Sequence, residues 1–203
     1  MDESSKAVRW NMPFWAERGP ETWNLSFPDE PMDAGPISLR PWRKADATCR
    51  VEASNDPLIL EYTSVESDLT VAEAEEWIVK RDSDMADGIS IFMAIQESES
   101  EKFLGSLGLI DFIWNEGRAE IGYWMLPNGR GTGRLSELLN RFSSWALESL
   151  PIARIDLFTN LDNFSSIRTA ERAGYIQEGL LHSFKPGRNG REDLLLFGRV
   201  GSG

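Results

Sequence analysis

A glycine-rich turn between a strand-like run and a helix-like run carries the residues whose chemistry is easiest to name. The strand-like run ends at Pro127, and glycines alternate with other residues over 129–133. Glycine lets backbone N–H groups approach an oxyanion closely. The first amides of a helix have no partner within it, and the helix dipole favours negative charge there. With Arg130 and Arg134 beside it, the turn predicts a site for a phosphate or pyrophosphate.

Several other chemistries lack the residues they need. The only histidine, His182, and the only cysteine, Cys49, exclude a multi-histidine or cysteine-rich metal site and an intramolecular disulfide. The chain contains neither the Gly-x-Ser-x-Gly of many serine hydrolases nor a Walker A pattern. Glycines at every second position of the turn also differ from the Rossmann pattern Gly-x-Gly-x-x-Gly. We therefore expect no metal in the protein.

Length and charge narrow the class of partner. The 203 residues suit one domain with an extension, and the formal net charge is −12. This charge argues against nucleic-acid binding and suits a cationic partner such as an amine, although it also serves solubility. No apolar run is long enough to span a membrane, and the first residues lack a signal-peptide core. We expect a cytoplasmic protein with neither a nucleic-acid nor a membrane partner.

Hydrophobic periodicity predicts an α/β domain with a mixed sheet. The expected strands are 37–42, 90–96, 103–112, 119–126, 155–159, 176–184 and 192–200, and the expected helices are 46–54, 70–81, 133–150 and 165–173. Thr70 and Glu73 form a capping-box pattern at one helix start, and Gly174 follows another helix as its C′ residue. Short connections between the strands of 90–126 favour an antiparallel meander.

We divide the chain into an extension over residues 1–36, one domain over 37–200, and a terminal Gly-Ser-Gly at 201–203 that has the composition of a cloning remnant. Repeated prolines in the extension forbid long regular elements. Its tryptophans, Trp10, Trp15 and Trp23, each carry a large apolar area. We therefore expect the extension to pack on the domain or on a second subunit, which would make a homodimer.

The glycine turn also has the spacing of a known motif. The stretch from Glu120 to Glu137 is similar to Gln/Arg-x-x-Gly-x-Gly/Ala after a strand that ends near a proline. Counting from the proline puts Arg130 first and Gly133 fourth, with Leu135 where a small residue is usual. A second register, beginning at Asn128, restores the final glycine but breaks the spacing from the proline.

A second segment strengthens the match. Residues 163–179 are similar to an Asn-x-x-Ser helix followed by Gly-Phe/Tyr-x-x-Glu-Gly, and the spacings agree without gaps. Together the two segments resemble the GNAT acyltransferase superfamily, most closely its RimJ/RimL-like N-acetyltransferase branch. The resemblance covers roughly residues 37–200.

The resemblance implies a mixed, mostly antiparallel sheet flanked by helices, with a central splay between its fourth and fifth strands. It also implies acetyl-CoA, or another acyl-CoA, as co-substrate, with pyrophosphate in the glycine turn and pantetheine in the splay. The residues that it assigns to the cofactor are Trp124, Met125, Leu126, Arg130, Gly131, Thr132, Gly133, Arg134, Leu135, Asn163 and Ser166.

Transfer to an amine needs an acceptor for the amine proton and a donor for the leaving thiolate. Glu120, on the strand that leads to the glycine turn, is our candidate base, with Asp111 as second choice. The alternative for Glu120 is a structural carboxylate paired with Arg118. Many relatives have a tyrosine donor at the position of Ala170, so the resemblance leaves Ser166 as the donor here, although a serine at this point can also cap the helix.

The leading hypothesis is an N-acetyltransferase that uses direct attack in a ternary complex. The acceptor is a primary amine: a protein N-terminus, a lysine or a small molecule. The alternative is a non-catalytic protein of the same fold that binds or senses acyl-CoA, a view favoured by the absent tyrosine and by Leu135.

Overall fold

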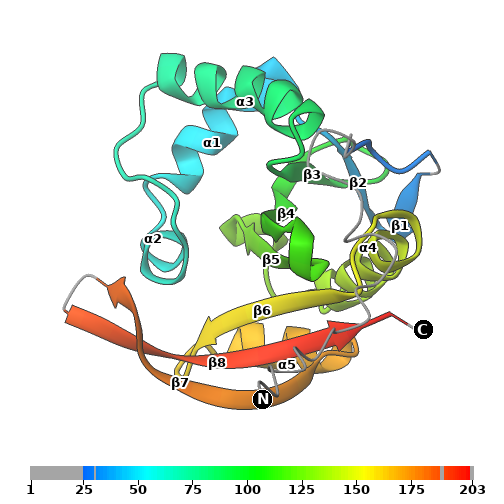
Figure 1. Ribbon diagram of the computed structural model, residues 1–203. Helices are drawn as coiled ribbons and strands as arrows, with labels where there is room; N and C mark the ends of the chain where they lie inside the picture. Colours follow the sequence, from blue (N-terminus) through cyan, green and yellow to red (C-terminus); the bar gives the residue numbers. More distant parts are fainter. Residues whose placement is uncertain (1–24, 30, 188–189, 202–203) are drawn as a thin grey trace, which may run out of the picture.

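A computed structural model describes residues 25–29, 31–187 and 190–201 of the chain (Figure 1). Its strands are β1 (Met32–Ala34), β2 (Ile37–Pro41), β3 (Ile91–Glu97), β4 (Phe103–Ile113), β5 (Arg118–Met125), β6 (Arg154–Asn160), β7 (Ile176–Gly187) and β8 (Gly190–Val200). Its α-helices are α1 (Ala47–Ala53), α2 (Pro57–Tyr62), α3 (Val71–Ala86), α4 (Leu135–Ser149) and α5 (Phe164–Arg172). Short 3₁₀ turns are η3 (Lys44–Asp46), η4 (Trp114–Glu116) and η5 (Pro127–Gly129).

The described strands form one sheet whose centre is split. The order is β1-β2-β3-β4-β5-β6-β8-β7, and every neighbouring pair is antiparallel except β5 and β6. Those two strands run parallel and pair only at 118–120 with 154–156, after which they diverge (Figure 1). This arrangement confirms the predicted mixed sheet, with the splay between the fourth and fifth strands when counting starts at β2.

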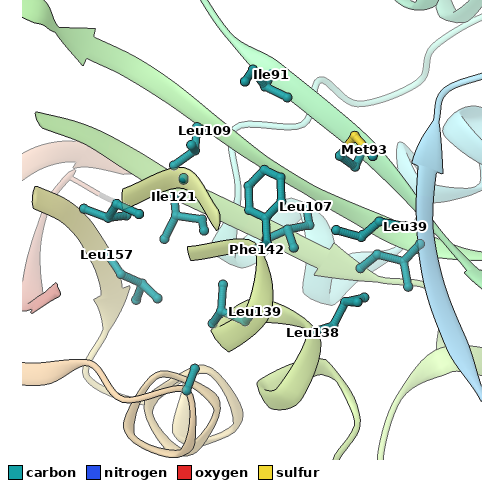
Figure 2. Close-up of a cluster of buried hydrophobic side chains, with 14 of the residues drawn as sticks. Leu39, Ile91, Met93, Leu107, Leu109, Ile121, Leu138, Leu139, Phe142 and Leu157 are labelled. Carbon is teal, nitrogen blue, oxygen red and sulfur yellow. The ribbon is translucent and has the colours of Figure 1, made fainter. Parts of the chain in front are cut away.

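One face of the sheet packs on α4 and α5. Leucines and aromatics at helical spacing put Leu138, Leu139 and Phe142 on one side of α4, and all three side chains are fully buried. Figure 2 shows Phe142 directed at the sheet, where Leu107 and Ile121 belong to the same apolar cluster. The cluster joins residues from both halves of the split sheet, so α4 holds the two halves in one core.

The other face is covered by α1, α2 and α3, and aromatic rings fill much of the contact. Trp42 packs edge-on against Trp77 of α3, with ring centroids 5.1 Å apart, and lies 4.9 Å from the ring of Phe103. Trp124 of β5 joins the same group at 6.2 Å from Trp42. Because side chains alternate along a strand, Glu120 of β5 shares this face with Trp124.

The described part of the predicted extension lies on the domain. Leu25 is buried in the α4-side core, and β1 pairs with β2. The three tryptophans of the extension lie outside the described residues, as do residues 202–203. The proposed division of the chain and the contact with a second subunit remain predictions.

Most element predictions are confirmed, with two exceptions. The capping box of Thr70 and Glu73 forms at the start of α3, and Gly174 follows α5 at φ 84°. Helix α2 is not among the predicted elements, because Asn55-Asp56-Pro57, directly after the predicted helix 46–54, is typical of a helix end. In the structure Asp56 also caps α2, accepting the N–H of Ile59, and proline occupies the first turn. Strand β1 was missed as well. Among the described residues, no helix has the length and apolarity to cross a membrane.

Candidate active site

A cavity of about 980 Å³ runs through the splay and is lined by residues from both faces of the sheet. On the α4 side it is lined by the glycine turn and α5, and on the other side by residues of α1, α2, α3 and β3. The predicted site residues that line it are Glu120, Trp124, Met125, Arg130, Gly131, Thr132, Gly133, Leu135, Asn163 and Ser166, together with Asp111. Leu126 and Arg134 lie outside this lining.

The glycine turn has the backbone that the sequence predicts for an anion site. Gly131 and Gly133 adopt φ of 78° and 70°, in the left-handed region that favours glycine. A Cβ on Gly131 would meet no atom within 4 Å, so the backbone borders open space. Helix α4 begins at Leu135 without a side-chain cap, which leaves its first amides available to an anion.

The two arginines of the turn are already engaged. Arg130 donates from Nε to the carbonyl of Met125 at 2.9 Å, and its Nη2 lies 2.6 Å from Oδ1 of Asp56. Arg134 lies beside Gly35, with Nη1 3.9 Å from Oε2 of Glu137. Arg134 is therefore placed away from the cavity, and Arg130 ties α2 to the end of β5.

Two arginines of α5 line the cavity instead. Arg168 and Arg172 are four residues apart and share one side of the helix. Nη1 of Arg172 lies 3.9 Å from the position that a Cβ on Gly133 would occupy. We did not predict either residue. Their spacing in the second motif was visible in the sequence, but nothing local indicated that this helix faces the glycine turn.

At the end of β5, every second residue turns its backbone N–H and C=O groups toward the splay. Leu126 donates its N–H to the carbonyl of Leu104 at 2.8 Å, so its backbone points to β4. By alternation Trp124 also faces β4, whereas Ile121, Tyr123 and Met125 face the splay. The predicted cofactor contacts of Trp124 and Leu126 stay predictions, and their backbones face β4. Of the three residues named from the resemblance, Met125 turns its backbone to the cavity side, where its carbonyl accepts a hydrogen bond from Nε of Arg130.

Glu120 lies at the point where β5 and β6 part, opposite Asp156 in the last parallel pair. Burial raises the pKa of Glu120 to about 7; the nearby charge of Asp111 adds to the effect and Lys185 opposes it. Arg118 does not pair with Glu120, because its guanidinium binds Glu116 at 2.6 Å and Asp156 at 3.1 Å.

Asp111 sits on a bulge of β4 next to this carboxylate. The pairing of β4 with β5 shifts between Ile110 and Ile113, and Asp111 adopts φ 48°. A left-handed backbone is costly for most residues, and aspartate tolerates it better than most. The bulge places a second acid on the cavity lining within electrostatic reach of Glu120.

The predicted donor has a partner that sequence reasoning missed. The hydroxyls of Ser166 and Tyr123 lie 2.9 Å apart, where α5 approaches β5. Burial raises the pKa of Tyr123 to about 12, so the phenol keeps its proton. Asn163 accepts the N–H of Ser166 at 3.1 Å and the hydroxyl of Ser165 at 2.9 Å. The helix cap is therefore Asn163, which leaves the hydroxyl of Ser166 to Tyr123.

The other residues singled out in the sequence lie elsewhere. His182 is exposed on β7 with Nδ1 2.9 Å from Oδ2 of Asp193, and neither His182 nor Cys49 lines the cavity. Within residues 25–29, 31–187 and 190–201, no three His, Cys, Asp or Glu side chains form a metal-binding group.

The comparisons with known proteins all indicate the same family. Residues 37–176 match the model of the acetyltransferase (GNAT) domain. The uncharacterized N-acetyltransferase p20 of Bacillus licheniformis is 25% identical over 161 residues, covering 79% of this chain and 90% of that protein. The structure is similar to RimL, a ribosomal L7/L12 alpha-N-protein acetyltransferase in complex with coenzyme A, with TM-score 0.72, 17% identity and coverage of 84% and 98%. It is also similar to spermidine N-acetyltransferase from Vibrio cholerae in complex with CoA and spermine, with TM-score 0.71, 21% identity and coverage of 82% and 96%. The chain therefore belongs to the GNAT acetyltransferase family and is an N-acetyltransferase.

Proposed function

We propose that the protein transfers an acetyl group from acetyl-CoA to a primary amine by direct attack in a ternary complex. The observation that carries the proposal is the single cavity through the splay. It joins an anion site at the α4 N-terminus to a carboxyl group of raised pKa on the opposite side. A donor and an acceptor can thus enter from different faces and meet where β5 and β6 part.

The residues of the α4 side fit a CoA-like ligand. The amides of Gly131, Gly133 and the first turn of α4 suit a pyrophosphate, and Arg172 adds a cation beside them. The N–H of Met125 and the backbone of Tyr123 face the splay and suit the amides of pantetheine. RimL and the spermidine enzyme, whose structures contain CoA, support this assignment.

The two sides of the splay supply the groups for the two proton transfers. Acetyl-CoA supplies the acetyl group as an activated thioester. Glu120 accepts a proton from the amine, since a base with a pKa of about 7 is well matched to neutral conditions. A free N–H of β5 stabilises negative charge on the carbonyl oxygen. The hydroxyl pair of Ser166 and Tyr123 gives a proton to the leaving sulfur, so that amide and thiol are the products.

The proposal is tested by incubating the protein with acetyl-CoA and a panel of amines. Peptides with free N-termini, lysine-containing peptides, polyamines and small amines cover the classes named above. We expect free thiol to appear together with one acetylated amine, identified by mass spectrometry, and Glu120→Gln to reduce both signals. Tight CoA binding without thiol release across the panel would instead indicate a non-catalytic acyl-CoA-binding protein.

A further inference from the structure

A buried cation faces the amine side of the cavity without an anionic partner. Arg50 of α1 is only 5% exposed, yet it lines the cavity. Its Cζ lies 4.2 Å from the centroid of the Trp77 ring. Within the described part of the chain, no ion pair or hydrogen bond to its guanidinium is found, and Nε is buried without a partner.

A neighbouring arginine shows how such a charge is normally neutralised. Arg81 lies over the same Trp77 ring at 4.3 Å, but its Nη2 is 2.8 Å from Oδ2 of Asp84. Among the described residues, the carboxylate that acts on Arg50 is the exposed Glu66, which lies beyond ion-pair distance. A buried charge without a partner is costly, and the face of a tryptophan offsets only part of that cost.

Arg50 remains a cation under ordinary conditions. Burial, and then the charge of Arg81, lower its pKa to about 10, which still leaves the group protonated at neutral pH. The fold therefore maintains a positive charge on the wall of the cavity, and none of the described side chains pairs with it.

Arg50 and Glu120 line the same cavity, and Phe92 and Gly122 line it between them. Phe92, Gly108 and Gly122 lie in one row across β3, β4 and β5, and the ring of Phe92 is 5.3 Å from that of Trp77. A Cβ on Gly122 would meet nothing within 4 Å, whereas one on Gly108 would lie 2.6 Å from the ring of Phe92, so this ring covers Gly108 and the space is open at Gly122. Two strand spacings, about 10 Å, separate the backbones of Phe92 and Gly122, and Glu120 follows two residues away on the same face.

We propose that the acceptor is an amine that also carries a carboxylate, which Arg50 binds while Glu120 receives the amine proton. The inference rests on the proposed function and names the acceptor class of the same site. A guanidinium binds a carboxylate through paired, charge-assisted hydrogen bonds. An acceptor with both groups has no net charge, so a protein of net charge −12 does not repel it. The distance of about 10 Å between the two ends of this row favours several bonds between amine and carboxylate, as in an ω-amino acid or a short peptide.

The test compares ω-amino acids of increasing chain length with ω-amino alcohols of the same length. The wild-type protein should prefer the carboxylate in kcat/KM by roughly tenfold or more at its best length, as expected for a hydrogen bond to a charged group. Arg50→Gln should remove the preference, and Arg50→Lys should keep part of it.

Arg81→Gln is the matched control, because Arg81 is the other cation over Trp77 but does not itself line the cavity. It should leave the preference unchanged. Each preference is a ratio within one variant, so a change in the amount of folded protein cancels. Turnover without a preference for the carboxylate, or a preference that survives Arg50→Gln, would overturn the inference. Absence of turnover with every amine would instead count against the proposed function.

Discussion

We assign Glu120 as the general base because of its surroundings rather than because of its residue type. The cavity lies beside Glu120 because the pairing of β5 with β6 ends there. Burial and the nearby charge of Asp111 disfavour the ionised form of Glu120. Hydrophobic periodicity predicted the strand, and the resemblance predicted the role of this residue. The sequence did not predict that Arg118 would be occupied by other acids, which removes the alternative of a simple ion pair.

The pH dependence of the reaction should follow this carboxyl group. With a pKa of about 7, Glu120 accepts a proton only when ionised, so kcat/KM should fall as pH drops below about 7 and level off above it. Glu120→Gln should lower kcat by about 10²–10⁴ with little change in the affinity for CoA. Steady-state rates from pH 5 to 9, with calorimetric CoA titration, measure both. An unchanged kcat would remove Glu120 from the mechanism.

Asp111→Asn separates a neighbouring charge from a second candidate base. Asparagine also tolerates the left-handed backbone at this bulge, so the strand should keep its shape. Losing the Asp111 charge should lower the pKa of Glu120 and move the midpoint of the rate profile to lower pH, with turnover at pH 8 retained. Loss of turnover at every pH would assign the base to Asp111 instead.

The same carboxyl group makes a prediction for stability. A folded-state pKa near 7 lies above the ordinary value of 4.5, so the folded protein holds an extra proton between these values and loses stability as pH rises through them. Glu120→Gln removes this loss and should raise the free energy of unfolding by roughly 1–3 kcal/mol at pH 8, with little gain from this source below pH 4.5. Urea denaturation at several pH values checks it. A difference that is independent of pH would contradict the raised pKa.

At the scale of elements, local patterns were predicted better than contacts across the chain. The Thr70 capping box and the amphipathic face of α4 follow from nearby residues, and both are confirmed. The partner of Arg130 is Asp56, 74 residues away, and no local pattern indicates such a pair. The approach of α5 to β5, which brings Tyr123 to Ser166, is likewise set by the sheet order.

Gly133→Glu tests the turn between β5 and α4. The new side chain places a carboxylate where the first amides of α4 are available to an anion, so CoA affinity should fall by at least about tenfold. Gly35→Glu is the control, since Gly35 has a similar φ of 67° but does not line the cavity. Calorimetry should find weak CoA binding for the first variant and near-normal binding for the second. Equal affinities would rule out the turn as the pyrophosphate site.

For the whole molecule, one apolar core has to hold a sheet that is open at its centre. Phe142 is fully buried in the cluster that contains strand residues from both sides of the splay. Phe142→Ala should reduce the free energy of unfolding by about 3–5 kcal/mol, the usual cost of such a cavity. Chemical denaturation measures it. A loss below about 1 kcal/mol would show that α4 does not join the two halves.

The net charge of the chain is negative, whereas the charge of Arg50 in the cavity is positive. The net charge of −12 led us to expect a cationic partner, whereas the amine side of the cavity contains a buried arginine. Composition reports only the sum of charges, and the burial of one cation depends on how α1 packs on α3 and β3. A zwitterionic acceptor is compatible with both observations.

The central claim is that donor and acceptor meet in the splay between β5 and β6. A crystal structure with CoA bound tests it most directly. We predict that the pyrophosphate binds the amides of Gly131 and Gly133 beside Arg172. Pantetheine should lie along β5, with the sulfur between Ser166 and Glu120. A cofactor bound outside the splay, or a sulfur remote from Glu120, would contradict it.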